Sequence, residues 1–307
     1  MNQDHFAGLL QRCDDLPARP TAVIHPCEAG ALQGALEAAR LGLIEPILVG
    51  PRNRIEATAT AAGLDLGGIP VEDVPHSHAA AERGVALVRE GRAEMLMKGS
   101  LHSDELLHAV LARDSGLRTD RRLGHVFAMN VPSYHKPLFI TDAAVNILPN
   151  LYEKADLCRN AIDLLHALGI ERPKVALISA VETITPQLTS TLDAAALVLM
   201  SLRGQINGAL LDGPLAFDNA ISAQAAQTKG IRSEVSGDPD ILLVPNMEAG
   251  NILAKQLIYL SAAEAAGLVL GAQVPIVFTS RSDSPRSRIA SCALALLLAS
   301  TQSGAST

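Results

Sequence analysis

The chain has 307 residues, of which 48% are hydrophobic and only 3% aromatic, with no tryptophan. That length allows two α/β domains, and the abundance of Ala, Leu, Val and Ile suits helices packed on parallel strands better than an aromatic-rich β sandwich. With 25 Lys+Arg against 32 Asp+Glu, the formal net charge is −7, which argues against a surface that attracts nucleic acid or anionic lipid through bulk charge.

Short apolar runs rich in β-branched residues alternate with longer Ala/Leu segments of helical spacing along most of the chain. In chain order, we expect strands at 21–25, 46–49, 94–97, 126–131, 138–141, 174–178, 206–211, 240–244 and 275–279. Because strands separated by helices need crossover connections, this repeat predicts a mainly parallel sheet with helices on both faces.

The interval 124–142 departs from the repeat, because two apolar runs lie close together around the turn-rich segment 132–137. We expect a β-hairpin there and a domain boundary near it. A second boundary is expected near Gly271. The predicted architecture has two α/β domains around a central cleft, the first formed by 1–130 plus 272–307 and the second by 131–271.

The chain has four cysteines, Cys13, Cys27, Cys158 and Cys292, and they form no Cys-x-x-Cys pair. Their spacing suggests neither a zinc ribbon nor a disulfide framework, so we expect a cytoplasmic protein. The N-terminus lacks the pattern of a secretory signal. The longest apolar runs, 194–200 and 292–299, fall short of the ~20 residues that cross a bilayer, and we expect them to be buried helix faces.

The first candidate site follows the predicted strand at 94–97 and reads Lys98-Gly99-Ser100. Ligands of parallel sheets bind at the carboxyl ends of strands, where a glycine admits a close approach, a lysine supplies charge and the next helix offers N–H groups to an anion. The segment is therefore a candidate phosphate cradle. Neither a P-loop nor a G-x-G-x-x-G motif occurs, and an ordinary strand end with a surface lysine explains the segment equally well.

Two further polar, glycine-bearing loops, 212–218 and 245–251, also follow predicted strands. Taken separately, each could be turn and N-cap chemistry, with Asp218 or Asn246 capping a helix. Together they favour a shared ligand site.

The segment 279–288 places three arginines and several hydroxyls between a predicted strand and a helix. A capping loop needs one hydroxyl or carboxylate, so a purely structural interpretation leaves Arg281, Arg286 and Arg288 as solvated charge. We favour a functional interpretation. The planar donor fork of arginine suits phosphate, a serine hydroxyl can donate to a carbonyl oxygen that gains charge, and a carboxylate can accept a thiol proton.

Across nearly its whole length the chain resembles the phosphate acetyltransferases and phosphate butyryltransferases, which interconvert acyl-CoA plus phosphate with acyl phosphate plus CoA. The motifs that carry the resemblance are Leu96-Met97-Lys98-Gly99, 139–146, 212–218, 245–252 and 279–284. The resemblance implies two α/β domains of the isocitrate and isopropylmalate dehydrogenase type around a cleft. It also implies a homodimer that holds no cofactor or metal and uses CoA and short acyl-CoA as substrates.

The resemblance further implies that Ser280 and Arg281 are the catalytic Ser-Arg pair, with the serine near the thioester carbonyl and the arginine on phosphate. In the acetyl branch Gly and Cys follow the pair, and the carboxylate taken as thiol base lies where this chain has Ser287 or Arg288. Asp283 is the nearest candidate base here, and the Ser-Arg-x-Asp-Ser form is more similar to the butyryl branch. The residues expected to bind phosphate or CoA are Lys98, Gly99, Ser100, Asp142, Gly213, Pro214, Asn246, Glu248, Gly250, Asn251 and Arg286.

The chain differs from the family's pattern at a second place, in the helix after Ser100. Relatives are expected to carry an arginine there, and this chain has His108. Histidine is a weaker phosphate ligand near neutral pH, so Arg118, Arg121 or Arg122 could replace it, or His108 could be an ordinary surface residue.

The expected mechanism is direct transfer in a ternary complex, for which proximity and charge stabilisation suffice. Two other functions stay open. A metal- and nicotinamide-dependent decarboxylating dehydrogenase would need clustered aspartates and a dinucleotide loop, and we find no convincing set. A non-catalytic acyl-CoA or phosphate sensor would keep the site and lack turnover.

Overall fold

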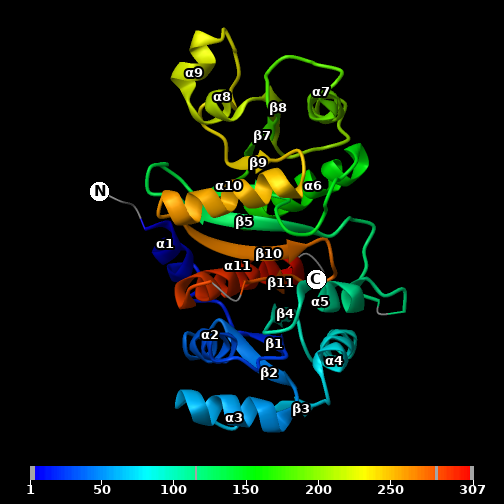
Figure 1. The fold of residues 1–307 in the computed structure, drawn as a ribbon, viewed down its shortest axis with the longest axis vertical. Helices are drawn as coiled ribbons and strands as arrows, with labels where there is room; N and C mark the ends of the chain where they lie inside the picture. The colour runs from blue at the N-terminus through cyan, green and yellow to red at the C-terminus, as the bar shows by residue number, and fades with distance from the viewer. Residues whose placement is uncertain (1–3, 115, 281–282, 305–307) are drawn as a thin grey trace. The chain divides into compact units, whose positions relative to one another are not determined.

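A computed structural model of the chain describes residues 4–114, 116–280 and 283–304 (Figure 1). The chain folds into two compact units. The N-terminal unit comprises Phe6–Arg121 and the residues from Ala266 onward, and the central unit comprises Arg122–Ala265 with the first residues up to His5. Each unit combines helices with a parallel-rich arrangement of strands, as the alternating sequence pattern predicts.

The helices are α1 His5–Gln11, α2 Ala29–Arg40, α3 Arg52–Ala62, α4 Ser77–Arg89, α5 Ser103–Leu111, α6 Leu151–Ala167, α7 Thr189–Leu202, α8 Phe217–Ile221, α9 Ala223–Thr228, α10 Met247–Leu260 and α11 Pro285–Gly304. The strands are β1 Arg19–Ile24, β2 Ile44–Gly50, β3 Val71–Asp73, β4 Met95–Lys98, β5 Gly124–Asn130, β6 Leu138–Thr141, β7 Lys174–Ile178, β8 Leu210–Leu215, β9 Ile241–Leu243, β10 Glu264–Leu270 and β11 Ile276–Val277.

The strands of the N-terminal unit follow the order β3-β2-β1-β4-β11-β10. All neighbours are parallel except β10 and β11, which are antiparallel. In Figure 1, α2 lies on one side of β1 and β2 and α4 on the other. The strand order changes direction at β1, with β2 on one side and β4 on the other, and such a switch point is where open α/β sheets place their ligands.

The strands of the central unit follow the order β5-β6-β9-β7-β8. The antiparallel pair β5 and β6, in register from Val126 with Thr141 to Met129 with Leu138, is the hairpin expected from sequence. The remaining neighbours are parallel.

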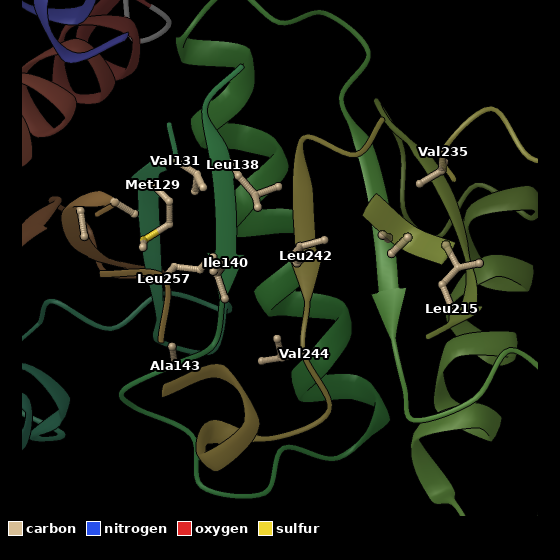
Figure 2. Close-up of a cluster of buried hydrophobic side chains, with 14 residues drawn as sticks. Met129, Val131, Leu138, Ile140, Ala143, Leu215, Val235, Leu242, Val244 and Leu257 are labelled. Carbon is tan, nitrogen blue, oxygen red and sulfur yellow. The ribbon is translucent and has the colours of Figure 1, made fainter. Parts of the chain in front are cut away.

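The core of the central unit explains why its strands are so apolar (Figure 2). Met129, Ile140 and Leu242 come from the neighbouring strands β5, β6 and β9, and Leu257 of α10 belongs to the same buried cluster. Burying such side chains removes aliphatic surface from water and supplies the main driving force for this unit.

Capping fixes the start of α6, which packs against the strands of the central unit. The Asn150 side chain accepts hydrogen bonds from the N–H groups of Tyr152 and Glu153, and the Glu153 carboxylate accepts one from the N–H of Asn150. This capping box satisfies donors that the first helical turn leaves free.

The sequence-based strand assignment was wrong at three places. The strand expected at 206–211 is β8, which begins at Leu210, because Gly208 adopts a left-handed φ of 81° and the chain is still turning after α7. As a result, Asp212-Gly213-Pro214 lies within a strand and not in a loop after it. The short β3 was missed, and so was β10, whose Ala- and Leu-rich sequence resembles a helix but pairs with β11 through Leu268 and Val277.

The segment 292–299 of α11 is buried throughout, as expected, whereas 194–200 of α7 is only partly buried and leaves Leu199 exposed. All four cysteines are free and buried. Among the described residues, no helix is both long enough and apolar enough to span a bilayer.

Candidate active-site loops

The loop with Ser280 leaves the sheet of the N-terminal unit between a buried strand and a helix. β11 pairs in parallel with β4, with Val277 opposite Met97. Their carboxyl ends, one leading to Thr279-Ser280 and the other to Lys98-Gly99, therefore lie side by side. Thr279 is buried, whereas Ser280 is exposed. The structure thus brings two of the expected motifs together at one edge of the sheet.

Hydrogen bonds hold both backbone groups of Ser280. Its N–H donates to Oδ2 of Asp283 at 2.7 Å, and its carbonyl oxygen accepts from the Asp283 N–H at 3.2 Å. The same carbonyl accepts from Nη2 of Arg288 at 2.9 Å. The backbone of the expected catalytic serine is therefore held in place. The expected base, Asp283, is one of the residues that hold it through hydrogen bonds.

The three arginines of this loop have different surroundings. Arg281 and Ser282 lie outside the described residues, and Arg286 is exposed. Arg288 is only 4% exposed, so its charge is not a solvated surface charge, which was the structural alternative for this residue. Burial lowers its pKa from the ordinary value, but a guanidinium remains charged at neutral pH. Nothing in the local sequence distinguishes it from Arg286, because its burial depends on a helix about 250 residues earlier in the chain.

The expected phosphate cradle, Lys98-Gly99-Ser100, is built into the end of β4. Lys98 is only 4% exposed, so it is not a surface lysine, and its Nζ lies 5.7 Å from the centre of the Phe278 ring. That distance suits a cation–π contact. A Cβ on Gly99 would overlap the carbonyl oxygen of Ile24, so this glycine is required by close packing on β1. The glycine does not by itself indicate a ligand.

Ser100 is tied to the end of β1. Its hydroxyl donates to the carbonyl oxygen of His25 at 2.7 Å and accepts from the Cys27 N–H at 3.1 Å. His25, which sequence reasoning missed, is buried with a left-handed φ of 53°, and burial lowers the pKa of its imidazole. These contacts give Ser100 a role in shaping the switch point between β1 and β4.

In the central unit, Asp142 organises the turn after β6. The side chain is 2% exposed. Oδ1 accepts from the N–H groups of Ala144 and Val145 at 2.8 and 3.0 Å. Oδ2 accepts from the N–H and the Nδ2 of Asn146 at 3.1 and 2.6 Å. Both oxygens of this expected substrate-binding carboxylate are thus engaged within the protein.

The first turns of α10, which follows β9, pack directly on that turn. A Cβ on Gly250 would lie 2.8 Å from the carbonyl oxygen of Asp142, and Nδ2 of Asn251 donates to the Ala143 carbonyl at 3.1 Å. Asn246 caps α10 by accepting the Ala249 N–H at 2.9 Å. Glu248, in the first turn of α10, is exposed. The structure therefore joins two expected motifs within this unit and leaves Glu248 facing solvent.

Gly213 and Pro214 lie in β8 next to β7. A Cβ on Gly213 would lie 2.6 Å from Cβ of Leu177, so glycine is needed for the two strands to approach. His108 is exposed on α5. Of its possible replacements, Arg122 donates from Nε to Oδ1 of Asn146 at 2.8 Å and forms an ion pair with Glu153 at 3.3 Å.

The fold and these loops define a class of protein: an α/β protein that presents a serine hydroxyl and a lysine at the carboxyl ends of parallel strands. The described residues contain no group of three or more His, Cys, Asp or Glu side chains arranged to hold a metal ion. A serine hydroxyl and a lysine in this position suit an anionic substrate with a carbonyl group.

Comparison with known proteins identifies the family. The model for phosphate acetyl/butaryl transferase matches residues 77–296, so the chain belongs to the phosphate acetyl/butyryl transferase family. It is 60% identical over 279 residues to a phosphate acetyltransferase of Rhizobium meliloti, covering 91% of this chain and 88% of the relative. It is 40% identical over 294 residues to a phosphate butyryltransferase of Clostridium acetobutylicum, covering 96% of this chain and 98% of the relative.

A solved structure agrees with this assignment. The branched-chain phosphotransacylase of Enterococcus faecalis V583 superposes with a TM-score of 0.79 at 29% identity, covering 91% of this chain and 99% of that one. The resemblance expected from the motifs is thereby confirmed. The comparisons favour neither the decarboxylating dehydrogenase nor the non-catalytic sensor.

Proposed function

We propose that the protein is a phosphate acyltransferase, which interconverts a short-chain acyl-CoA plus phosphate with an acyl phosphate plus CoA. The observation that carries the proposal is the exposed Ser280, whose backbone is held by Asp283 and Arg288, on a strand end beside that of the buried Lys98. Membership of the phosphate acetyl/butyryl transferase family supports it. A rigidly held hydroxyl can stabilise charge that develops on a carbonyl oxygen.

The proposed reaction is a direct transfer. The CoA thiolate attacks the carbonyl carbon of the acyl phosphate, the carbon–sulfur bond forms, and the bond to the phosphate oxygen breaks. Ser280 donates a hydrogen bond to the carbonyl oxygen, and Arg281 neutralises the departing phosphate. In the reverse direction phosphate attacks the thioester and the thiolate leaves. Holding both substrates in one complex can lower the barrier by ~7–11 kcal/mol.

We further propose that Asp283 accepts the thiol proton. Its Oδ2 accepts the Ser280 N–H, so the proposal assigns the proton to Oδ1. The prediction is that Asp283→Asn loses the acidic limb of the pH–rate profile of kcat. A wild-type profile in this variant rejects the assignment. Of Ser287 and Arg288, the two residues expected near the place of the acetyl branch's carboxylate, Ser287 is buried with its hydroxyl 3.0 Å from that of Ser284, and neither is proposed as the base.

The residues expected to bind substrate divide into two kinds under this proposal. Lys98, Arg286, Glu248 and Asn251 carry groups that could contact phosphate or CoA, and the last three are exposed. The others, Gly99, Ser100, Asp142, Gly213, Pro214, Asn246 and Gly250, are proposed to act mainly by shaping the loops, in view of their contacts within the protein.

The test of the reaction is phosphate-dependent release of free thiol from acetyl-, propionyl-, butyryl- and isobutyryl-CoA. We propose acetyl-CoA or butyryl-CoA as the preferred substrate, in keeping with the names of the relatives. The absence of phosphate-dependent release from all four would refute the proposed function.

The site is tested by Ser280→Ala and Arg281→Gln, each expected to lower turnover by ~10²–10³-fold through loss of a transition-state donor. Arg113→Gln is the matched control, because Arg113 is exposed in another loop of the N-terminal unit. Wild-type turnover in both site variants would remove this loop from the active site.

We also propose the finer architecture implied by the family: domains 1–130 plus 272–307 and 131–271, of the isocitrate dehydrogenase type, in a cytoplasmic homodimer that needs no bound cofactor. The division into two compact units supports the two-domain arrangement, and the four free cysteines support the cytoplasmic location. For dimerisation, the support is a set of large apolar side chains left more than half exposed, among them Leu202 of α7 and Ile252 and Tyr259 of α10. Light scattering on the wild type and on Ile252→Lys tests it.

A further inference from the structure

Arg288 is a buried cation with hydrogen bonds to Thr279 and Ser280 of the N-terminal unit. It lies in the first turns of α11 and is 4% exposed. Removing a guanidinium from water is unfavourable unless hydrogen bonds and charges replace its hydration. The contacts of this side chain therefore show what keeps it in place.

The guanidinium bridges two consecutive residues of the proposed catalytic loop. Nη1 donates to the hydroxyl oxygen of Thr279 at 2.9 Å, and Nη2 donates to the carbonyl oxygen of Ser280 at 2.9 Å. Arginine is suited to this task because its donors form a rigid planar fork. A lysine, with a single ammonium group, could not reproduce both bonds in the same geometry.

Asp283 completes the arrangement on the other side of Ser280. Its carboxylate accepts the Ser280 N–H at 2.7 Å, and its own N–H donates to the Ser280 carbonyl at 3.2 Å. Arg288 and Asp283 therefore fix the peptide groups on both sides of the Ser280 Cα. Ser280 itself is exposed, and the proposed function assigns the carbonyl oxygen to its hydroxyl.

We infer that Arg288 is a positioning residue, which sets the orientation of the Ser280 hydroxyl by holding the Thr279 side chain and the Ser280 backbone. This inference rests on the proposed function, because it concerns how Ser280 acts. Arg288 is almost fully buried, so it works through the loop and not by contact with phosphate. Displacing a reacting group by about 1 Å can lower a rate by ~10²-fold, which makes such a support measurable.

A second segment holds the stem of Arg288 from outside the loop. Gly34, buried in α2, packs so closely that a Cβ there would lie 2.6 Å from Cδ of Arg288 and 3.3 Å from its Cβ. Gly30 is one turn earlier in the same helix, and its Cβ would lie 3.9 Å from Nη2, an ordinary contact. The two glycines provide a matched pair of substitutions, of which Gly34→Ala displaces the arginine and Gly30→Ala does not.

The first experiment compares kcat and both KM values of the wild type, Arg288→Met, Arg288→Lys, Gly34→Ala and Gly30→Ala, using acetyl-CoA or butyryl-CoA and inorganic phosphate. We expect Arg288→Met to lower kcat by ~10–10²-fold with KM changed less than ~threefold, since orientation is lost and not binding. Arg288→Lys should recover part of the loss. Gly34→Ala should lower kcat as Arg288→Met does, and Gly30→Ala should keep the wild-type kcat.

A double-mutant cycle separates positioning from a general loss of structure. If Arg288 acts through Ser280, Arg288→Met in a Ser280→Ala background should lower kcat by less than ~threefold, because the hydroxyl that it positions is already gone. A full further loss in that background would overturn the inference. So would wild-type kcat in Arg288→Met, or an equal loss in Gly30→Ala and Gly34→Ala.

Amide hydrogen exchange of Ser280, measured by NMR on the full chain, tests the inference without turnover. Exchange should be faster in Arg288→Met and Gly34→Ala and unchanged in Gly30→Ala. Unchanged exchange in Arg288→Met would overturn the positioning role. If the wild type releases no thiol, the proposed function fails on its own, and the exchange rates still decide whether Arg288 holds the loop.

Discussion

The carboxylate of Asp142 offers a clear test of whether a motif residue binds substrate or maintains the fold. In Asp142→Asn the side chain keeps its shape, but one of its two oxygens becomes an NH2 group that cannot accept a hydrogen bond. Each oxygen now accepts two bonds within the turn, so whichever way the amide is oriented two bonds are lost. Asn146 cannot compensate by flipping, because its Oδ1 already accepts from Arg122.

The expected loss of stability follows from the number and kind of hydrogen bonds that are removed. Hydrogen bonds to a charged group contribute ~1.5–3 kcal/mol each, so the loss of two corresponds to about 3–6 kcal/mol, and relaxation of the turn favours the lower end. A loss of about 3 kcal/mol is a large part of the 5–15 kcal/mol by which domains are usually stable, yet it leaves the variant folded at 25 °C.

Urea unfolding followed by circular dichroism, together with kcat and KM for both substrates, measures the effect. We expect a lower midpoint for Asp142→Asn and KM within about threefold of the wild type under conditions where the variant is folded. Glu171→Gln, a neutralised and exposed carboxylate of the same unit, is the matched control and should change neither quantity. Unchanged stability with a tenfold rise in KM would show that Asp142 binds substrate directly and would refute the reasoning.

Three further predictions concern the core, the pH dependence and the cysteines. Ile140, fully buried in the cluster of Figure 2, should lose ~2–5 kcal/mol of unfolding free energy on Ile140→Ala and ~0.5–1.5 kcal/mol on Ile140→Val, measured by urea unfolding. Burial acts to raise the pKa of Asp238, but hydrogen bonds from two lysines, one of them Lys174, outweigh it and lower the pKa to about 2. A carboxylate with a depressed pKa stabilises the fold fully above its unfolded pKa of ~3.9 and loses that contribution as pH falls through the folded pKa, so Tm of Asp238→Asn should be below wild type at pH 7, with the difference shrinking below about pH 4 and closing only below about pH 2. Burial raises the pKa of Cys158 and of Cys292 to about 12, so neither thiol should react with a disulfide reagent before unfolding, and an early reaction of either one contradicts the assigned burial.

The parallel order and the β5-β6 hairpin could be predicted because local patterns specify them. β-Branched runs mark the strands, and the short interval 132–137 permits only a direct turn between two of them. The start of β8 and the whole of β10 could not be predicted in this way. Ala and Leu fit a helix as well as a strand, and β10 is a strand because β11, from later in the chain, pairs with it.

The chemistry of the loop at Ser280 was apparent from residue types, but the different roles of its three arginines were not. Three arginines at positions 281, 286 and 288 look alike in sequence. The burial of Arg288 depends on Gly34, a residue of α2 that lies about 250 positions earlier and leaves room for the stem. Contacts over such a separation are set by tertiary packing, which no local pattern encodes.

The motifs that identify the family are in large part requirements of packing. At Gly99, Gly213 and Gly250, an added Cβ would collide with the backbone of a neighbouring strand or turn, so each glycine is required whether or not a substrate is present. A sequence match at such positions is therefore evidence that the fold is preserved, and it carries little information about turnover. The case for catalysis depends instead on the chemistry of exposed loop residues, above all Ser280. It follows that substitutions at these glycines should lower stability and kcat together, whereas Ser280→Ala should lower kcat alone.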